Sequence, residues 1–150
     1  MEKGIDIYGI ISENMELADN PIESYSPLTL AYIGDAIYEI VVRTMVVSEG
    51  NTQVNKLHKR SSSLVKAETQ ARMIKLLMDA DKLTEEELSY YKRGRNAKSY
   101  TSAKNASIGD YRIATGFEAL MGYLYITGQS SRMISIIKDG LKLLENSCIV

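Results

Sequence analysis

Three acidic residues interrupt otherwise apolar stretches of the chain, and they are the first candidates for chemistry. Asp35 and Glu39 lie four residues apart, which places both on one face of a helix. Glu118 lies in a second apolar stretch, between Gly116 and Gly122. Carboxylate oxygens are hard ligands that suit Mg²⁺ or Mn²⁺. If the two stretches pack together, Asp35 and Glu118 could hold a divalent ion that activates water for hydrolysis.

Both acidic stretches can also be explained without a catalytic or metal-binding role. Asp35 and Glu39 could lie on the solvated face of their helix, which spacing alone favours. Glu118 could lie at the partly exposed edge of its apolar stripe, because a lone buried carboxylate is costly unless it is paired or binds a metal. Gly34 disfavours a helix by about 1 kcal/mol relative to Ala. We therefore expect a packing reason for it, such as the close approach of another helix.

The first acidic stretch belongs to a long predicted helix. Ser26 is a favourable N-cap, and Pro27 is favoured at the first helical position. Gly50 predicts the end of the helix. Between these signals, apolar residues recur at steps of three and four, which is typical of an amphipathic helix. They are Leu30, Ile33, Ile37, Ile40, Val41 and Met45.

The rest of the chain also predicts helices and no convincing strand. Thr84 and Glu87 form a capping-box pattern, which indicates the start of a helix. The predicted helices cover about residues 52–80 with a break at the serine run 61–63, then about 84–93, about 110–127, and a last segment after Gly128. The predicted fold is all-α, a compact helical bundle. We expect one domain over residues 1–150, in which 1–25 is a leading segment that holds one helical turn.

A basic stretch between two of these helices is a candidate surface for binding a polyanion. Residues 91–109 carry five lysines and arginines and no acid, and their composition predicts a loop from Gly94 onward. Such a loop could supply the electrostatic, sequence-independent part of binding to a nucleic acid duplex. A solvated loop without a ligand is the alternative that composition leaves open.

Composition limits the classes of protein to consider. The 150 residues include a single cysteine, Cys148, so an internal disulfide is excluded and a cytoplasmic setting is expected. No stretch is long and apolar enough to cross a membrane. The net charge is −1, so nucleic-acid binding must depend on where the charges lie. Cys148 and the one histidine, His58, are assigned no chemistry.

The acidic segments together resemble the catalytic domain of ribonuclease III. Its signature is an acid followed by two hydrophobic residues, Gly and Asp, and later Phe-Glu-Ala-Leu. The chain is more similar still to the small Mini-ribonuclease III subfamily, in residues 32–39, 93–98 and 111–120. The resemblance covers about residues 26–145, and as in that subfamily we expect no double-stranded-RNA-binding domain after the nuclease domain.

The resemblance implies a ribonuclease III-like endonuclease domain that hydrolyses double-stranded RNA. It implies Mg²⁺ as the cofactor, with Mn²⁺ as a substitute, and products with 5′-phosphate and 3′-hydroxyl ends. The partners would be a second copy of the chain, forming a homodimer, and the precursor of large-subunit ribosomal RNA, whose ends the enzyme would mature. A ribosomal protein on that substrate is a further candidate partner. The implied catalytic and metal-binding residues are Asp35 and Glu118, and the implied RNA-binding residues are Arg93, Arg95, Asn96, Lys98 and Lys104.

The chain departs from the full-length family at two of four expected carboxylates. Ala31 stands four residues before Asp35, and Thr115 stands three residues before Glu118, where that family has acids. The number of metal ions and their affinity are therefore open. Glu39 and Thr115 are candidates to support the ligands, although a surface role for Glu39 fits the sequence equally. A non-catalytic RNA-binding or ribosome-assembly module on the same fold is the main alternative, and a helical interaction protein is a third.

Overall fold

All regular structure in the part of the chain that the computed structural model describes, residues 6–98 and 107–147, is helical. This confirms the all-α prediction. The leading segment holds more helix than the single turn that the sequence predicts. In chain order the elements are α1 (Ile7–Asn14), the 3-10 turn η1 (Ile22–Ser24), α2 (Pro27–Ser48), α3 (Val54–Val65), α4 (Ala67–Asp79), α5 (Glu85–Asn96), α6 (Ile108–Ile126) and α7 (Ser130–Ser147).

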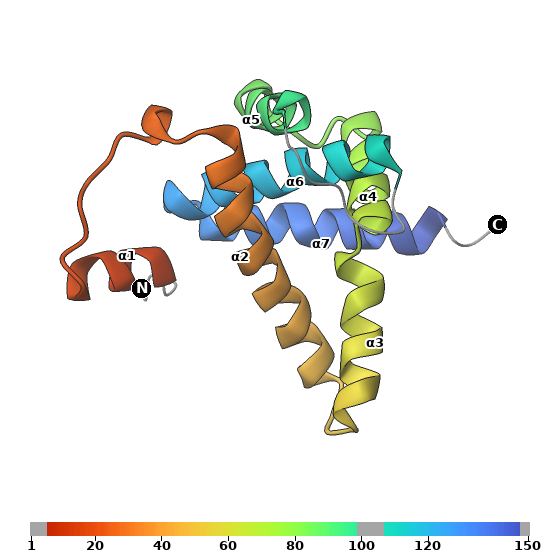
Figure 1. Cartoon of the computed structure of the whole chain (residues 1–150). Coiled ribbons are helices and arrows are strands. Elements are labelled where there is room, and N and C mark those ends of the chain that lie inside the picture. Colours follow the sequence, from red (N-terminus) through yellow and green to blue (C-terminus); the bar gives the residue numbers. More distant parts are fainter. Residues whose placement is uncertain (1–5, 99–106, 148–150) are drawn as a thin grey trace.

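Helix α6 lies at the centre of the structure, and α2, α4, α5 and α7 pack against it (Figure 1). Eleven of its 19 residues are buried, which makes it the core helix. The lower part of α2 and the neighbouring α3 form an arm that projects from the rest of the molecule (Figure 1). Across the described ranges, no helix has the length and apolar content needed to cross a lipid bilayer.

The helix ends follow the local signals in the sequence. The Ser26 hydroxyl accepts a hydrogen bond of 3.1 Å from a backbone N–H in the first turn of α2. Thr84 and Glu87 form the predicted capping box at the start of α5. Gly50 and Gly128 follow α2 and α6 with φ values of +124° and +73°, which glycine adopts readily. The predicted ends of these helices are confirmed.

One predicted break lies in the wrong place. The sequence predicts an interruption at the serine run 61–63, but α3 continues through it and the chain bends at Lys66, whose backbone is extended. The hydroxyl of buried Ser61 donates to the carbonyl oxygens of Leu57 and His58, at 3.0 and 3.2 Å, within the helix. The serine is therefore satisfied inside α3 and does not end it.

The end of α5 also differs from the prediction. The sequence predicts that this helix ends near Arg93 and that a loop covers residues 94–109. The helix continues to Asn96. Gly94 is buried against α6, where an added Cβ would lie 2.7 Å from the Cβ of Ala119. The glycine is therefore a point of close helix packing, and this tertiary contact outweighs its weak helix propensity.

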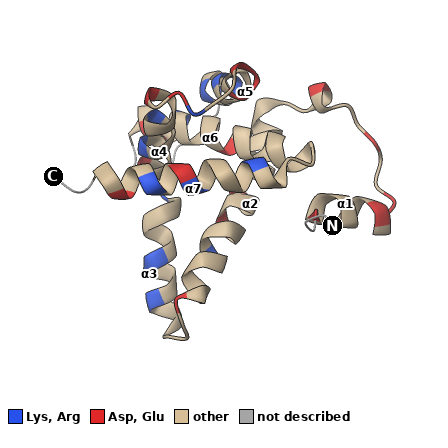
Figure 2. Ribbon diagram, turned by 180° about the vertical axis from the view of Figure 1, so that it is seen from behind, with Lys and Arg blue, Asp and Glu red and all other residues tan. Residues whose placement is uncertain are grey.

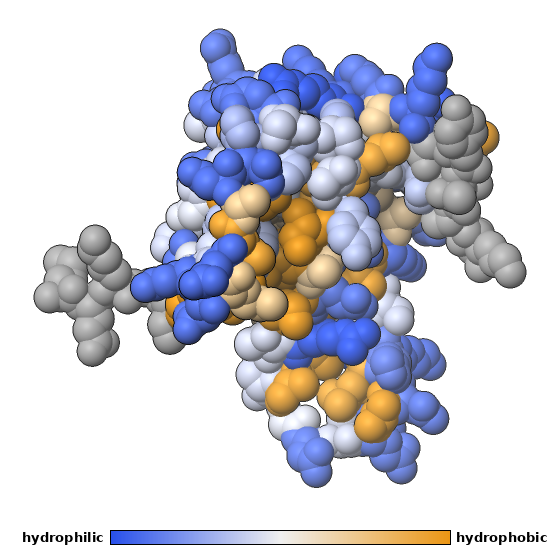
Figure 3. Space-filling model, turned by 60° about the vertical axis from the view of Figure 1, so that its left-hand side comes forward, coloured by the Kyte–Doolittle hydropathy of each residue, from blue (hydrophilic) through white to orange (hydrophobic). Residues whose placement is uncertain are grey.

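Charged and apolar side chains gather on different parts of the surface. Helix α3 carries lysine and arginine residues and no acid, and basic residues also gather near the end of α5 (Figure 2). Apolar residues lie on one face of the body and on the arm of α2 and α3 (Figure 3). Among the large apolar side chains of the described ranges, Tyr32 on α2 has the highest exposed fraction, 81%.

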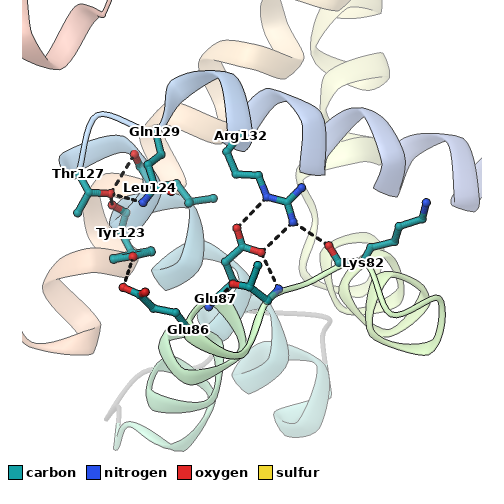
Figure 4. A network of polar contacts seen from close by, with 9 residues as sticks. Lys82, Glu86, Glu87, Tyr123, Leu124, Thr127, Gln129 and Arg132 are labelled. Carbon is teal, nitrogen blue, oxygen red and sulfur yellow. Dashed lines mark hydrogen bonds and ion pairs between the residues drawn. The ribbon is translucent and has the colours of Figure 1, made fainter.

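A partly buried ion pair joins α5 to α7 (Figure 4). The carboxylate of Glu87 accepts hydrogen bonds from Nε and Nη2 of Arg132, at 2.8 and 2.9 Å, and from the backbone N–H of Thr84 at 2.9 Å. Arg132 also donates to the carbonyl oxygen of Lys82 at 2.8 Å. The hydrogen bonds from Arg132, more than any other contact, hold the pKa of Glu87 below its ordinary value.

Replacing Glu87 with glutamine should lower the free energy of unfolding near neutral pH by about 2 kcal/mol, because Arg132 loses its buried partner. The pKa of Glu87 is lower in the folded than in the unfolded chain. Its contribution is therefore present above the unfolded value of about 4.3 and is lost as pH falls through the folded value. Urea denaturation should show the variant and wild type converging below about pH 4.

Glu85→Gln is the matched control for this prediction, since the side chain of Glu85 is exposed in the same first turn of α5. It should change stability little at any pH. A difference between wild type and Glu87→Gln that stays constant across pH would contradict the assignment of this stability to the ion pair.

Candidate active site

The two acidic segments meet where α2 crosses α6. Gly34 lies against the backbone of Glu118, and an added Cβ would overlap its carbonyl oxygen. Gly122 lies in the same way against the carbonyl oxygen of Leu30. The two glycines let the backbones approach directly, so the expected packing reason for Gly34 is confirmed.

This crossing brings the carboxyls of Asp35 and Glu118 within hydrogen-bonding reach of each other. Asp35 follows Gly34 on α2, while Glu118 lies on α6 one turn before Gly122. Asp35 is exposed and Glu118 is half-buried. The pair therefore has one carboxyl that solvent reaches freely and one that is held in the protein surface.

Glu118 is poorly solvated where it lies. The pKa of Glu118 is raised to about 8, first by burial and then by a hydrogen bond to the neighbouring Asp35 carboxyl and by its like charge. The amide of Gln70 acts in the opposite direction, through a hydrogen bond that lowers the pKa. Near neutral pH the pair therefore favours a shared positive charge, either a proton or a cation.

The donor set fits a hydrated divalent ion rather than an enclosed metal site. Within residues 6–98 and 107–147, no group of three or more histidine, cysteine, aspartate or glutamate side chains is placed to hold a metal. Mg²⁺ is commonly bound by one or two carboxylates and keeps several waters. The mutual repulsion of Asp35 and Glu118 is relieved by such an ion, so these two residues are the ones that would hold it.

The two positions where this chain lacks an acid of the full-length family, Ala31 and Thr115, bring no charge to the site. Ala31 is buried, with 7% of its surface exposed. The hydroxyl of buried Thr115 donates to the carbonyl oxygen of Tyr111 at 2.9 Å, within α6. Glu39, one turn beyond Asp35, forms an ion pair of 3.2 Å with Arg43. These contacts give Thr115 and Glu39 other partners, and their support of the ligands stays a prediction.

Four of the five predicted RNA-binding residues lie at the end of α5 or directly after it. Arg93, Arg95 and Asn96 belong to the helix, and Lys98 follows it, whereas Lys104 lies outside the described residues. The Arg95 side chain donates to Asn96 at 3.2 Å. The guanidinium groups of the two arginines lie over tyrosine rings, 4.6 and 5.5 Å from the ring centres. These cations are therefore partly ordered by stacking on α5.

One residue beside the carboxyl pair was not predicted from the sequence. Gln70 on α4 is buried, with 2% of its surface exposed, and its side chain lies near enough to the Glu118 carboxyl to lower the pKa of that carboxyl. The signal available was a polar residue within the amphipathic pattern of this segment. That signal is weak, because only the packing of α4 on α6 shows that the side chain is buried.

Comparison with known proteins agrees with this architecture. Residues 28–129 match the family described as the ribonuclease III domain. Over 133 residues the chain is 49% identical to the Mini-ribonuclease 3 of Clostridium tetani, which covers 88% of this chain and 87% of that protein. Over 145 residues it is 42% identical to the Mini-ribonuclease 3 of a Thermoanaerobacter species, covering 97% and 99%. The chain therefore has a ribonuclease III domain and belongs to the Mini-ribonuclease 3 family.

A solved structure supports the same fold. A crystal structure of a protein from Fusobacterium nucleatum superimposes with a TM-score of 0.74 at 29% sequence identity. The match covers 83% of this chain and 99% of that one. The helical arrangement described above is therefore shared with an experimentally determined structure.

Proposed function

We propose that this protein is an endoribonuclease that hydrolyses double-stranded RNA with a divalent metal ion. The observation that carries the proposal is the pair of Asp35 and Glu118 at the crossing of α2 and α6. Membership of a family whose members are named ribonucleases supplies the substrate class. A non-catalytic RNA-binding module on the same fold is the alternative, and it gives no reason for keeping two repelling carboxyls together.

In this mechanism the protein binds and orients the ion, while water is the nucleophile. Asp35 and Glu118 would hold Mg²⁺, which would supply an activated water and stabilise the leaving oxygen of the phosphodiester. The backbone contact at Gly34 fixes where Glu118 lies relative to Asp35. In the described ranges no side chain of this site is a candidate covalent nucleophile. Products with 5′-phosphate and 3′-hydroxyl ends follow from water attack at phosphorus with release of the 3′ oxygen.

The cations at the end of α5 are proposed to contact the phosphate backbone of the duplex. Double-stranded RNA is recognised largely by shape and through its phosphates and 2′-hydroxyls. Replacing Arg93 and Arg95 together with alanine should reduce the slope of log affinity against log salt by about 2. Fluorescence anisotropy with a labelled duplex in EDTA measures this binding without cleavage.

The matched control replaces Lys138 and Lys142 of α7 with alanine, which removes the same charge from exposed positions on another helix. That variant should keep the salt slope of wild type. If the two double variants gave equal slopes, the end of α5 would not be the phosphate-binding surface.

A homodimer is proposed because two symmetric sites can cut the two antiparallel strands of a duplex. The exposed apolar surface on α2 supports association, and Tyr32 is its most exposed large side chain. Light scattering should give twice the mass of one chain. Tyr32→Glu should shift the mass toward that of one chain, and a wild type with the mass of one chain at working concentration would contradict the proposal.

The natural substrate is proposed to be the precursor of large-subunit ribosomal RNA, matured at its ends in the cytoplasm. A ribosomal protein bound to that RNA is a candidate partner. These assignments come from resemblance to the family. Incubating the protein with precursor RNA, free and bound to ribosomal proteins, and mapping the cleaved ends would test them.

The substrate class is tested by a gel assay with three labelled substrates and Mg²⁺. These are an RNA duplex, its separate single strand, and a DNA duplex of the same sequence. Cleavage of the RNA duplex alone is the expected result. Binding of the RNA duplex without cleavage in Mg²⁺ or Mn²⁺ would favour the non-catalytic module instead.

A further inference from the structure

Two tyrosine rings and an arginine form a stack that runs from α6 to the surface of α5. The rings of Tyr90 on α5 and Tyr123 on α6 are stacked, with their centres 3.8 Å apart and their planes 13° from parallel. The guanidinium group of Arg93 lies over the Tyr90 ring, 4.6 Å from its centre. Both tyrosines are buried, whereas Arg93 is exposed. The stack therefore joins an exposed cation to the core helix.

The buried end of this stack is fixed by a hydrogen bond. The hydroxyl of Tyr123 donates to Oε1 of Glu86 at 2.5 Å, which joins α6 to the first turn of α5 (Figure 4). A buried tyrosine hydroxyl usually needs such a partner, and the bond also fixes where the ring lies. Tyr123 follows Glu118 by five residues on the same helix. The position of Tyr90, and of the cation over it, is thereby tied to the helix that carries the candidate site.

Stacking leaves the N–H groups of a guanidinium available for a ligand. Its planar face can rest on an aromatic ring while its donors point outward in the fork that matches a phosphate. Across residues 6–98 and 107–147, no carboxylate forms an ion pair with Arg93. Arg93, Lys92 and Asn96 line one end of an open hollow on the surface of α5, and Glu85 lines the other end. The end with two cations and an amide suits a phosphate group.

We propose that Tyr90 is a positioning residue, whose ring, backed by Tyr123, holds the guanidinium group of Arg93 in place to receive a phosphate group of the RNA duplex. The inference rests on the proposed function, which assigns the end of α5 to the phosphate backbone. A mobile arginine loses rotamer freedom when it binds a phosphate, and a side chain already ordered by stacking loses less. Packing of α5 on α6 alone would be served by the two rings without an arginine over them.

The test is a double-mutant cycle on Tyr90 and Arg93, with the full chain, a labelled RNA duplex and EDTA. Fluorescence anisotropy gives the dissociation constant of each variant. Tyr90→Leu removes the ring and changes no charge, and it should weaken binding about threefold. In a chain that already carries Arg93→Ala, the same change at Tyr90 should have no further effect, because the ring acts through the arginine. Tyr90→Phe keeps the ring, so it should bind like wild type.

Tyr8→Leu is the matched control. Tyr8 on α1 contacts Tyr125 on α6 edge to face, with the ring centres 5.4 Å apart, so this variant also breaks a pair between a tyrosine and α6. It leaves Arg93 and its ring in place and should bind the duplex like wild type. A weakening equal to that of Tyr90→Leu would overturn the inference, because lost packing on α6 would then be the cause.

Two results at Tyr90 would overturn the inference and leave the proposed RNA-binding surface intact. They are wild-type binding by Tyr90→Leu, and an equal weakening by this change with and without Arg93. If wild type did not bind the duplex, or Arg93→Ala bound it like wild type, the proposed phosphate contact and this inference would both be removed. If circular dichroism shows that Tyr90→Leu is unfolded, Tyr90→Met takes its place in the cycle, with the same expected weakening and the same contrary results.

Discussion

Replacing Glu118 with glutamine should lower the single-turnover rate of duplex cleavage on the order of a thousandfold. Glutamine keeps the size of the half-buried side chain but cannot supply a charged ligand. It also removes the repulsion with Asp35. The variant should therefore lose activity without losing stability. This combination is characteristic of a residue that serves function and does not stabilise the fold.

The stability side of this prediction has a pH dependence whose sign can be worked out. In the metal-free protein the pKa of Glu118 is raised to about 8, whereas the unfolded chain has an ordinary glutamate value near 4.3. Between these values the folded state binds more protons, so wild-type stability should fall as pH rises. Urea denaturation of Glu118→Gln should show a smaller decline in stability with pH. At high pH, Mg²⁺ should restore the stability of the wild type but not that of the variant.

Glu68→Gln is the control for Glu118→Gln. Glu68 is a glutamate whose side chain is exposed in the first turn of α4. Its replacement should change the cleavage rate less than about threefold. Cleavage by Glu118→Gln at close to the wild-type rate would contradict the assignment of Glu118 as a metal ligand.

Adding a single methyl group at Gly34 should be among the most damaging changes in the fold. The new Cβ would overlap the backbone carbonyl of Glu118, so α2 and α6 would have to separate. We expect Gly34→Ala to lower the free energy of unfolding by about 4 kcal/mol and the midpoint of thermal unfolding by about 10 °C. Any folded fraction should also cleave RNA more slowly, because the carboxyl pair would be pulled apart.

Gly109→Ala provides the comparison for this change. Gly109 lies in the first turn of α6 with an ordinary φ, and the nearest atom to an added Cβ is the Ser107 hydroxyl oxygen at 3.9 Å. That variant should be as stable as wild type or slightly more so, because alanine restricts the unfolded chain. Similar stability of Gly34→Ala and Gly109→Ala would show that the helix crossing is looser than described.

The sequence predicts features that depend on local chemistry and is less informative where tertiary packing decides. Caps at Ser26 and Thr84 and the glycine after α2 act within a few residues, so the helix ends there were predictable. Gly94 is a loop signal by composition, yet it stays helical because α5 packs against α6 at this point. The bend at Lys66 is marked by no glycine or proline, and side-chain hydrogen bonds from Thr69 and Gln70 cross it.

The candidate site shows the same difference between features that follow from local sequence and features that depend on tertiary packing. The residue types and the resemblance were enough to propose Asp35 and Glu118 as the site, and the structure places their carboxyls near each other. The difference in exposure between them was not predictable, because it depends on how deeply α6 lies between its neighbours. Gln70 escaped notice for the same reason, since its contact with Glu118 joins residues 48 positions apart in the chain.

The most direct test of the metal-dependent nuclease is the single-turnover rate of RNA duplex cleavage as Mg²⁺ is added to metal-free protein. We expect no cleavage in EDTA, a rate that rises with Mg²⁺ and saturates, and no cleavage by a variant that carries both Asp35→Asn and Glu118→Gln. Cleavage that persists in EDTA would contradict the role of the ion. Cleavage by the double variant at the wild-type rate would contradict the role of the two carboxylates.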